Sequence, residues 1–175
     1  ASVRVAAAQG IGALNDRTSI PALINALGDA SSLVRDAAAQ ALGQLALPGE
    51  AAWHLSKLWD ADASVRAAAV TALGDLRDPM AVSALLAVFS NDSYLSVRAA
   101  AAKALGKIPD PRVVPALSAA LTQDRSSSVR VAIVEALGLL QDPAVFPALL
   151  EAAQNDPAAS VRVAAAQGIG ALNDR

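Results

Sequence analysis

The chain has 175 residues, a formal net charge of −2, no cysteine and one histidine. The absence of cysteine excludes disulfides, thiolate metal sites and a cysteine nucleophile, and the charge lacks the basic excess typical of nucleic-acid binders. No apolar run approaches the roughly 18 residues of a membrane span. We therefore expect neither nucleic-acid nor membrane binding, and a cytoplasmic location by default. Apolar residues make up 54% of the chain and aromatic residues only 3%, and the predominance of alanine and leucine favours closely packed helices.

A Val-Arg pair recurs along the chain at intervals of 31, 31, 32, 32 and 32 residues. Each pair opens a segment of the form Val-Arg-x-Ala-x-x-x-(Ala/Gly)-(Leu/Ile)-Gly-x-(Leu/Ile), whose apolar positions fall on one face of a helix. We call these segments the B helices. The pairs are Val3-Arg4, Val34-Arg35, Val65-Arg66, Val97-Arg98, Val129-Arg130 and Val161-Arg162.

A second helical segment, the A helix, is predicted between successive B helices. Three A helices are expected to begin at Asp-Pro, since aspartate is a good N-cap and proline is favoured at the first helical position; these starts are Asp78-Pro79, Asp110-Pro111 and Asp142-Pro143. Serine is the predicted cap of the B helices, at Ser2, Ser64, Ser96, Ser128 and Ser160. The sequence thus predicts one domain, with a lone B helix at 1–17 and helix pairs at about 18–46, 47–77, 78–109, 110–141 and 142–175.

An aspartate precedes the B-helix arginine by six residues in every complete repeat. The aspartate lies in the loop before the B helix, so its carboxylate can cap that helix and pair with the arginine of its own or the next repeat. We interpret the pairs as a structural ladder that sets how the repeats stack, in preference to a row of acid–base groups. They are Asp29/Arg35, Asp60/Arg66, Asp92/Arg98, Asp124/Arg130 and Asp156/Arg162.

The Asp-Pro starts, the A-helix motif Val-Pro-Ala-Leu, the loop aspartate and the B-helix motif together resemble HEAT repeats of the short type found in phycobilisome lyases. They also resemble engineered scaffolds built from that repeat. The resemblance covers the whole chain. It implies an all-α fold, an α-solenoid in which antiparallel helix pairs form a right-handed superhelix with the B helices on the concave face and the A helices on the convex face.

A glycine recurs near the end of each B helix, as at Gly74 and Gly106. Glycine in a helix costs about 1 kcal/mol relative to alanine, so its recurrence in register needs a reason. Two remain open, namely close approach of a neighbouring helix and the beginning of unwinding at the end of the B helix.

Residues 1–17 and 159–175 are identical at all 17 positions, whereas the internal segments 97–111 and 129–143 share only 8 of 15. Two explanations stay open: the chain is a segment of a longer array, or one helix was copied to the other end by engineering. Neither end carries the polar cap that solenoids need. We therefore predict head-to-tail self-association, which produces filaments or rings.

Positions that vary while the repeat frame is kept are the usual seat of specificity in such arrays. On the expected concave face they form a mixed, weakly polar surface with no phosphate-tracking basic stripe, which favours a protein partner. The candidate residues are Gln9, Asp36, Gln40, Gln44, Thr71, Asp75, Lys103, Lys107, Glu135 and Leu139.

The second repeat differs from the others because it holds both tryptophans and the histidine, at Trp53, Trp59 and His54. One interpretation is that the tryptophans fill space beside small neighbours and that His54 packs at or beside a core position. The other is an aromatic binding patch, since tryptophan is enriched at interfaces.

No residue pattern predicts catalysis, a cofactor or a metal site. One histidine and the lack of acidic clusters argue against a metal, and neither an activated nucleophile nor a phosphate-binding loop is evident. We expect a non-enzymatic scaffold for protein–protein interaction. The resemblance leaves one alternative, a subunit of a phycobilin lyase-like enzyme, and a HEAT-like DNA-repair protein is disfavoured by the acidic charge.

Overall fold

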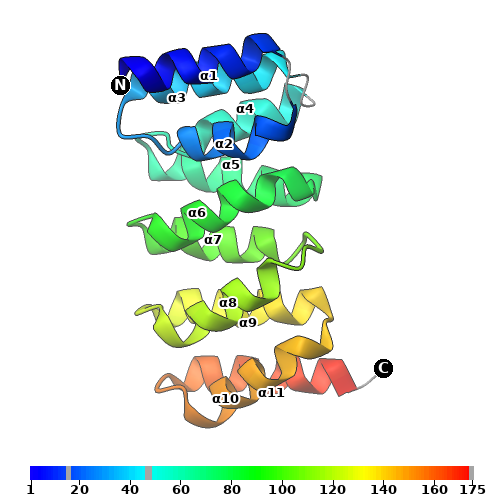
Figure 1. Cartoon of the computed structure of the whole chain (residues 1–175). Coiled ribbons are helices and arrows are strands. Elements are labelled where there is room, and N and C mark those ends of the chain that lie inside the picture. Colours follow the sequence, from blue (N-terminus) through cyan, green and yellow to red (C-terminus); the bar gives the residue numbers. More distant parts are fainter. Residues whose placement is uncertain (15–16, 46–48, 174–175) are drawn as a thin grey trace.

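The computed structural model describes residues 1–14, 17–45 and 49–173, which form a stack of helices with α1 and α11 at opposite ends (Figure 1). The B helices are α1 (Ser2–Leu14), α3 (Ser32–Gln44), α5 (Ala63–Leu76), α7 (Leu95–Leu105), α9 (Ser127–Leu140) and α11 (Ala159–Asn173). The A helices are α2 (Ile20–Ala26), α4 (Gly49–Lys57), α6 (Val82–Asn91), α8 (Val113–Gln123) and α10 (Phe146–Asn155). Three 3-10 turns are η1 (Arg17–Ser19), η2 (Pro79–Ala81) and η3 (Pro143–Val145). The described residues contain no strand, and the predicted all-α solenoid is confirmed.

The Asp-Pro motifs begin the A segments, as predicted, but the first turn is tighter than an α-helix. The Asp78 carboxylate accepts the N–H of Met80 at 2.9 Å, and Asp142 accepts that of Ala144 at the same distance. Each aspartate thus caps a 3-10 turn, η2 or η3, that leads directly into α6 or α10. Proline fits the first position of that turn because its missing N–H has no partner to lose there.

None of the serines predicted as caps of the B helices occupies the cap position. Ser64 is the second residue of α5, and the cap is Asp62, whose carboxylate accepts the Ser64 N–H at 2.8 Å. The loop aspartate sets this position, because Asp60 accepts the N–H of Asp62 at 3.0 Å and so holds the chain turned at the cap. The other predicted caps also lie at the first or second residue of their helices, namely Ser2, Ser96, Ser128 and Ser160.

Close approach of neighbouring B helices explains the glycines at two positions. A Cβ atom at Gly74 would lie 2.7 Å from Ala104 Cα, and one at Gly106 would lie 2.7 Å from Ala136 Cα. Unwinding does not require glycine, since the left-handed residues that end α5 and α9 are Arg77 and Gln141, with φ of 52° and 54°. At Gly74 and Gly106, glycine allows the backbones to pack closely.

The regular stacking of B helices is interrupted at α4. Helix α5 packs on α7, α7 on α9 and α9 on α11, and at the other end α1 packs on α3. Helices α3 and α5 make at most marginal contact in the described part of the chain, because α4 packs against both of them. The A helix α2 packs instead against α6, so α4 lies between two B helices (Figure 1). The expectation that every A helix lies on the convex side is therefore wrong for α4.

None of the helices in the described part of the chain is both long enough and apolar enough to cross a lipid bilayer.

We predict that Gly74→Ala destabilises the protein by about 1–3 kcal/mol, because its Cβ overlaps Ala104 in a packed core. The matched control is Gly138→Ala. Gly138 occupies the same place in α9 as Gly74 does in α5 and has nothing within 4 Å of an added Cβ. It should gain up to about 1 kcal/mol from helix propensity. Urea unfolding of both variants tests this, and equal effects would contradict the close-approach explanation.

Candidate functional site

The ladder arginines each bridge two loops. Arg130 Nη1 donates to the Asp124 carbonyl oxygen of its own repeat at 2.9 Å, while Nε and Nη2 donate to the Asp156 carboxylate of the next repeat at 2.7 and 2.9 Å. Arg66 and Arg98 make the same two sets of bonds. The prediction that each loop carboxylate pairs with the arginine of its own or the next repeat is therefore wrong: the carboxylate pairs with the arginine of the preceding repeat, and the arginine of its own repeat binds the aspartate's carbonyl oxygen instead. A bidentate arginine–carboxylate pair is both strong and directional, so each rung sets the distance and orientation between successive repeats.

The rungs formed by Arg66, Arg98 and Arg130 are well shielded from water. In the Arg130–Asp156 pair the side chains are only 10% and 6% exposed. The hydrogen bonds from Arg130 lower the pKa of the Asp156 carboxyl below its ordinary value, burial opposes this by raising it, and the Ala158 N–H lowers it further. A carboxylate held ionised and doubly bonded has no proton to donate at neutral pH, which favours a structural role over acid–base chemistry.

One rung is open. Arg35 keeps the bonds to its own loop, with Nη1 donating to the Asp29 and Ala30 carbonyl oxygens at 2.8 and 3.3 Å. No bond joins Arg35 to Asp60 in the described structure, where α3 packs on α4 and not on α5. Asp60 instead accepts the Asp62 N–H and forms an ion pair of 3.6 Å with Lys57.

A groove lies at the open rung. Arg35, Asp36 and Gln40 line it from the α3 side. Ser56, Lys57, Trp59 and Asp60 line it from the end of α4 and the following loop. Trp59 packs partly against the core and also borders a second groove beside the Arg66–Asp92 rung. The open-rung groove therefore combines charges of both signs with one large apolar ring.

The predicted concave-face residues fall into two groups. Gln9, Asp36 and Gln40 line a groove between α1 and α3. The other group spans α5, α7 and α9, where Thr71, Lys103, Lys107, Glu135 and Leu139 share a groove. The side chain of Gln44 lies outside the described residues. Because α4 lies between α3 and α5, these groups belong to separate surfaces.

The basic spot on α7 is neutralised by its neighbours. Lys103 pairs with Glu135 at 2.9 Å, and Lys107 pairs with Asp75 at 2.6 Å. Both pairs cross between adjacent B helices, so they link the repeats and leave little net charge for an anionic ligand. All four side chains are at least a third exposed, so each pair contributes little to stability.

The predicted aromatic patch is divided. Trp53, which is 57% exposed, makes an edge contact with His54 at 4.9 Å between ring centroids. Trp59 makes no ring contact with either of them in the described structure. His54 is half-buried, and its Nδ1 atom is buried with no hydrogen-bond partner among the described atoms.

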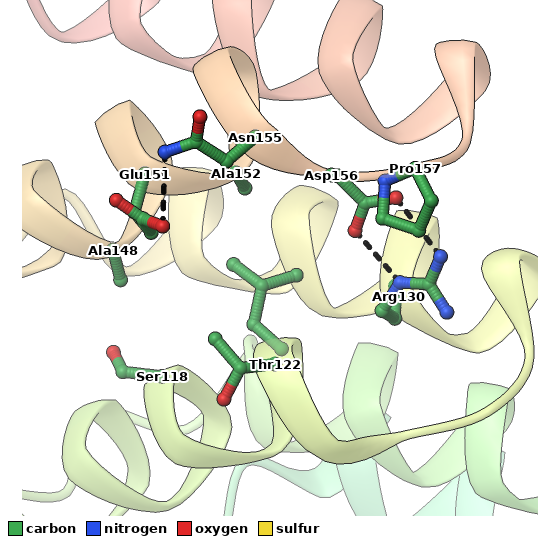
Figure 2. Close-up of a pocket in the computed structure, with 10 residues that line it drawn as sticks. Ser118, Thr122, Arg130, Ala148, Glu151, Ala152, Asn155, Asp156 and Pro157 are labelled. Carbon is green, nitrogen blue, oxygen red and sulfur yellow. Dashed lines mark hydrogen bonds and ion pairs between the residues drawn. The ribbon is translucent and has the colours of Figure 1, made fainter.

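Sequence reasoning missed a pocket of about 250 Å³ between α8 and α10 (Figure 2). Ser118 and Thr122 of α8 face the small residues Ala148 and Ala152 of α10 across it, and the Arg130–Asp156 rung lies at one end. The Ser118 hydroxyl is buried without a partner among the described atoms. The available signal was the pair of alanines one turn apart on α10, which leaves space where longer side chains would pack.

The described residues contain no group of three or more side chains that could hold a metal ion. The stacked antiparallel helix pairs and the arginine ladder define an α-solenoid repeat protein. The chain belongs to the HEAT-repeat family, whose model matches residues 1–61, 52–130 and 114–175.

Comparison with curated proteins returns no significant match. Among solved structures, the complex of CpcE and CpcF of phycocyanin lyase from Nostoc sp. PCC7120 is similar, with a TM-score of 0.62 and 27% identity over 88% of this chain and 99% of that chain. Human deoxyhypusine hydroxylase in complex with glycerol has a TM-score of 0.57 and 21% identity over 98% of this chain and 80% of that one. The second likeness shows the shared fold alone.

We predict that Arg130→Ala lowers the free energy of unfolding by about 3 kcal/mol, because it leaves the Asp156 carboxylate without its partner in a shielded site. Arg35→Ala is the matched control. It removes only bonds to carbonyl oxygens and should cost about 1 kcal/mol. Urea unfolding distinguishes the two, and equal losses would show that the downstream carboxylate contributes nothing.

The ladder also predicts acid sensitivity. Aspartate in the unfolded chain has a pKa of about 3.9, and the folded pKa of Asp156 lies below its ordinary value. The stabilising effect is therefore complete above about pH 5 and is lost as the pH falls through the folded pKa. Asp156→Asn should start less stable at neutral pH and lose less on acidification. Unfolding midpoints between about pH 3 and 7 measure both slopes, and parallel slopes would count against this role of Asp156.

Proposed function

We propose that this chain is a non-enzymatic scaffold that binds a protein partner at the open-rung groove and self-associates head to tail. The observation that carries the first part is the missing Arg35–Asp60 rung. At the closed rungs the guanidinium and the carboxylate satisfy each other, whereas here the Nε and Nη2 atoms of Arg35 have no hydrogen-bond partner among the described residues.

The groove suits a peptide segment that presents a carboxylate beside an apolar side chain. A partner carboxylate would occupy the place on Arg35 that aspartate fills at the other rungs, with the same bidentate geometry. The Trp59 ring would cover the apolar side chain. Arginine and tryptophan are the residue types most enriched at interface hot spots, and the similar phycocyanin lyase structure is itself a complex of two proteins.

The absence of an enzymatic role is supported by the chemistry of the described residues. The ladder carboxylates are bonded to arginines, and the partnerless Ser118 hydroxyl has only Arg130, Glu151 and Asp156 as ionisable neighbours in its pocket. Glu151 accepts a hydrogen bond from Asn155 at 3.0 Å, and Asp156 is engaged by Arg130. A nucleophile requires a base within hydrogen-bond reach, and the Ser118 hydroxyl has no hydrogen-bond partner among the described atoms, so neither carboxylate is placed to take its proton.

The partner-binding proposal can be tested by selecting displayed peptides on the intact chain. We expect the selected peptides to carry an acidic residue, and Arg35→Ala to weaken their binding by about tenfold or more, which is about 1.4 kcal/mol. Arg125→Ala is the control, because Arg125 is an exposed arginine of another loop. Peptides that bind the Arg35 variant as tightly as the unaltered chain would refute the groove as the site.

Self-association is supported by the identity of residues 1–17 with 159–175. Light scattering coupled to size exclusion should show a mass that grows with concentration. A mass that stays near 17.6 kDa over the whole series would rule out self-association as part of the function.

The alternative is a subunit of a phycobilin lyase-like enzyme, favoured by the 27% identity with the phycocyanin lyase complex. Addition of a bilin distinguishes the two functions. A new visible absorbance band that titrates with the protein would support the alternative, and an unchanged bilin spectrum would support the scaffold.

A further inference from the structure

Helices α1 and α11 have the same sequence but bury opposite faces. Val3 is 80% exposed, whereas its counterpart Val161 is fully buried. The other face shows the reverse, since Gly12 is buried and its counterpart Gly170 is exposed. An added Cβ at Gly170 would have no atom within 4 Å. Each helix therefore leaves open the surface that the other one covers.

The cause is the position of each helix in the stack. Helix α1 packs on α3, through the face that contains Gly12. Helix α11 packs on α9 and α10, through the face that contains Val161. An internal B helix uses both faces: in α9, Val129 on one face and Val134 on the other are almost completely buried. The two terminal helices together thus make the contacts of one internal helix.

The ladder arginines divide in the same way. Arg4 has only the downstream bonds, from Nε and Nη2 to the Asp29 carboxylate at 2.7 and 3.1 Å. Arg162 has only the upstream bonds, from Nη1 to the carbonyl oxygens of Asp156 and Pro157 at 2.8 and 3.2 Å. In the described structure Arg162 makes no bond to a downstream carboxylate. Its free Nε and Nη2 edge therefore matches the acceptor that Arg4 occupies.

We propose that α11 of one copy replaces α1 on α3 of a second copy, so that chains join by helix exchange. This inference rests on the proposed self-association and specifies its surface. The acceptor is the face of α3 together with Asp29, and the occupant is the α11 helix of another copy. Its Arg162 binds the second copy's Asp29 carboxylate and becomes a complete rung.

Exchange replaces the contact between α1 and α3 that it breaks. The displaced α1 and the incoming α11 have identical residues, so the contact with α3 is re-formed atom for atom. The additional contacts come from α11, which then buries both of its faces as an internal B helix does. Simple end-on stacking does not achieve this, because α1 would remain in place and no A helix would cover Val3.

Helix α1 therefore acts as a tethered competitor for its own acceptor face. Its attachment to the chain gives it an effective concentration of order millimolar, so the closed single chain predominates when the protein is dilute. The Arg4–Asp29 rung that holds α1 is the weakest of the described rungs, since the Arg4 side chain is 58% exposed while the other paired ladder arginines are 10–18% exposed. Once released, a helix this short is marginal in water.

Two matched variants of the full chain test the exchange. Gly170→Val points into open space in the single chain but would collide with α3 in the joined one, so it should abolish growth of mass with concentration. Gly12→Val places the same side chain in the buried α1–α3 contact. It should displace α1 from α3, so that assembly begins at a concentration at least about tenfold lower than for the wild type. Circular dichroism verifies that both variants stay helical.

A cross-link identifies the contact directly, because the chain has no cysteine of its own. Gln9 and Gln40 line the same groove between α1 and α3, and Gln167 is the counterpart of Gln9. A chain carrying Gln40→Cys and Gln167→Cys should form disulfide-linked dimers and longer products on oxidation. Helices α3 and α11 are too far apart in the stack for the bond to form within one chain (Figure 1).

The outcomes separate this inference from the proposed function. Growth of mass that persists in Gly170→Val, without the cross-link, would leave self-association standing and overturn the exchange. If the wild type stays a single chain while the Gly12→Val variant assembles and cross-links, the exchange is supported. Spontaneous self-association is then no longer part of the function. If neither the wild type nor the helical Gly12→Val variant assembles, both proposals fail.

Discussion

The arrangement of the repeats depends on the hydrogen bonds made by the arginine at the start of each B helix. Its guanidinium has donors on two edges, and at a complete rung one edge binds the carbonyl oxygens of the preceding loop while the other binds the carboxylate of the following loop. The same aspartate accepts the N–H of the residue that caps its own B helix, as Asp156 does from Ala158. One pair of residues per repeat thus sets the loop, the helix start and the distance to the next repeat.

Departures from this pattern leave a guanidinium or a carboxylate without the partner that it has at a complete rung. At α4 an A helix lies between two B helices, and the rung that would join Arg35 to Asp60 is absent. At the ends, the bonds of one complete rung are divided between two arginines. Arg4 has only the bonds to a carboxylate, and Arg162 has only the bonds to carbonyl oxygens. Both features follow from one constraint. A rung requires two B helices in direct contact, and wherever that contact is missing a guanidinium edge or a carboxylate remains available.

The glycines and small residues have a complementary role. Gly74 and Gly106 let α5, α7 and α9 approach until an added Cβ would overlap the neighbouring alanine. The Arg130–Asp156 rung forms without such a close approach, because nothing lies within 4 Å of an added Cβ at Gly138. The small side chains of Ala148 and Ala152 also leave the pocket between α8 and α10, where they face Ser118 and Thr122. In an alanine-rich stack, close packing and residual space therefore arise from the same residue choice.

The amino-acid sequence by itself determined the helices, the repeat and the chemistry of the ladder, because these follow from local periodicity, capping residues and spacing. It also revealed the identical ends, although their opposite burial required the structure. Tertiary packing decided which arginine each loop carboxylate pairs with, that α4 lies between α3 and α5, and that Trp59 makes no ring contact with Trp53 and His54. The physical reason is that an amphipathic segment specifies which face it buries but not which neighbour covers that face. That choice depends on the apolar surface available in the assembled stack.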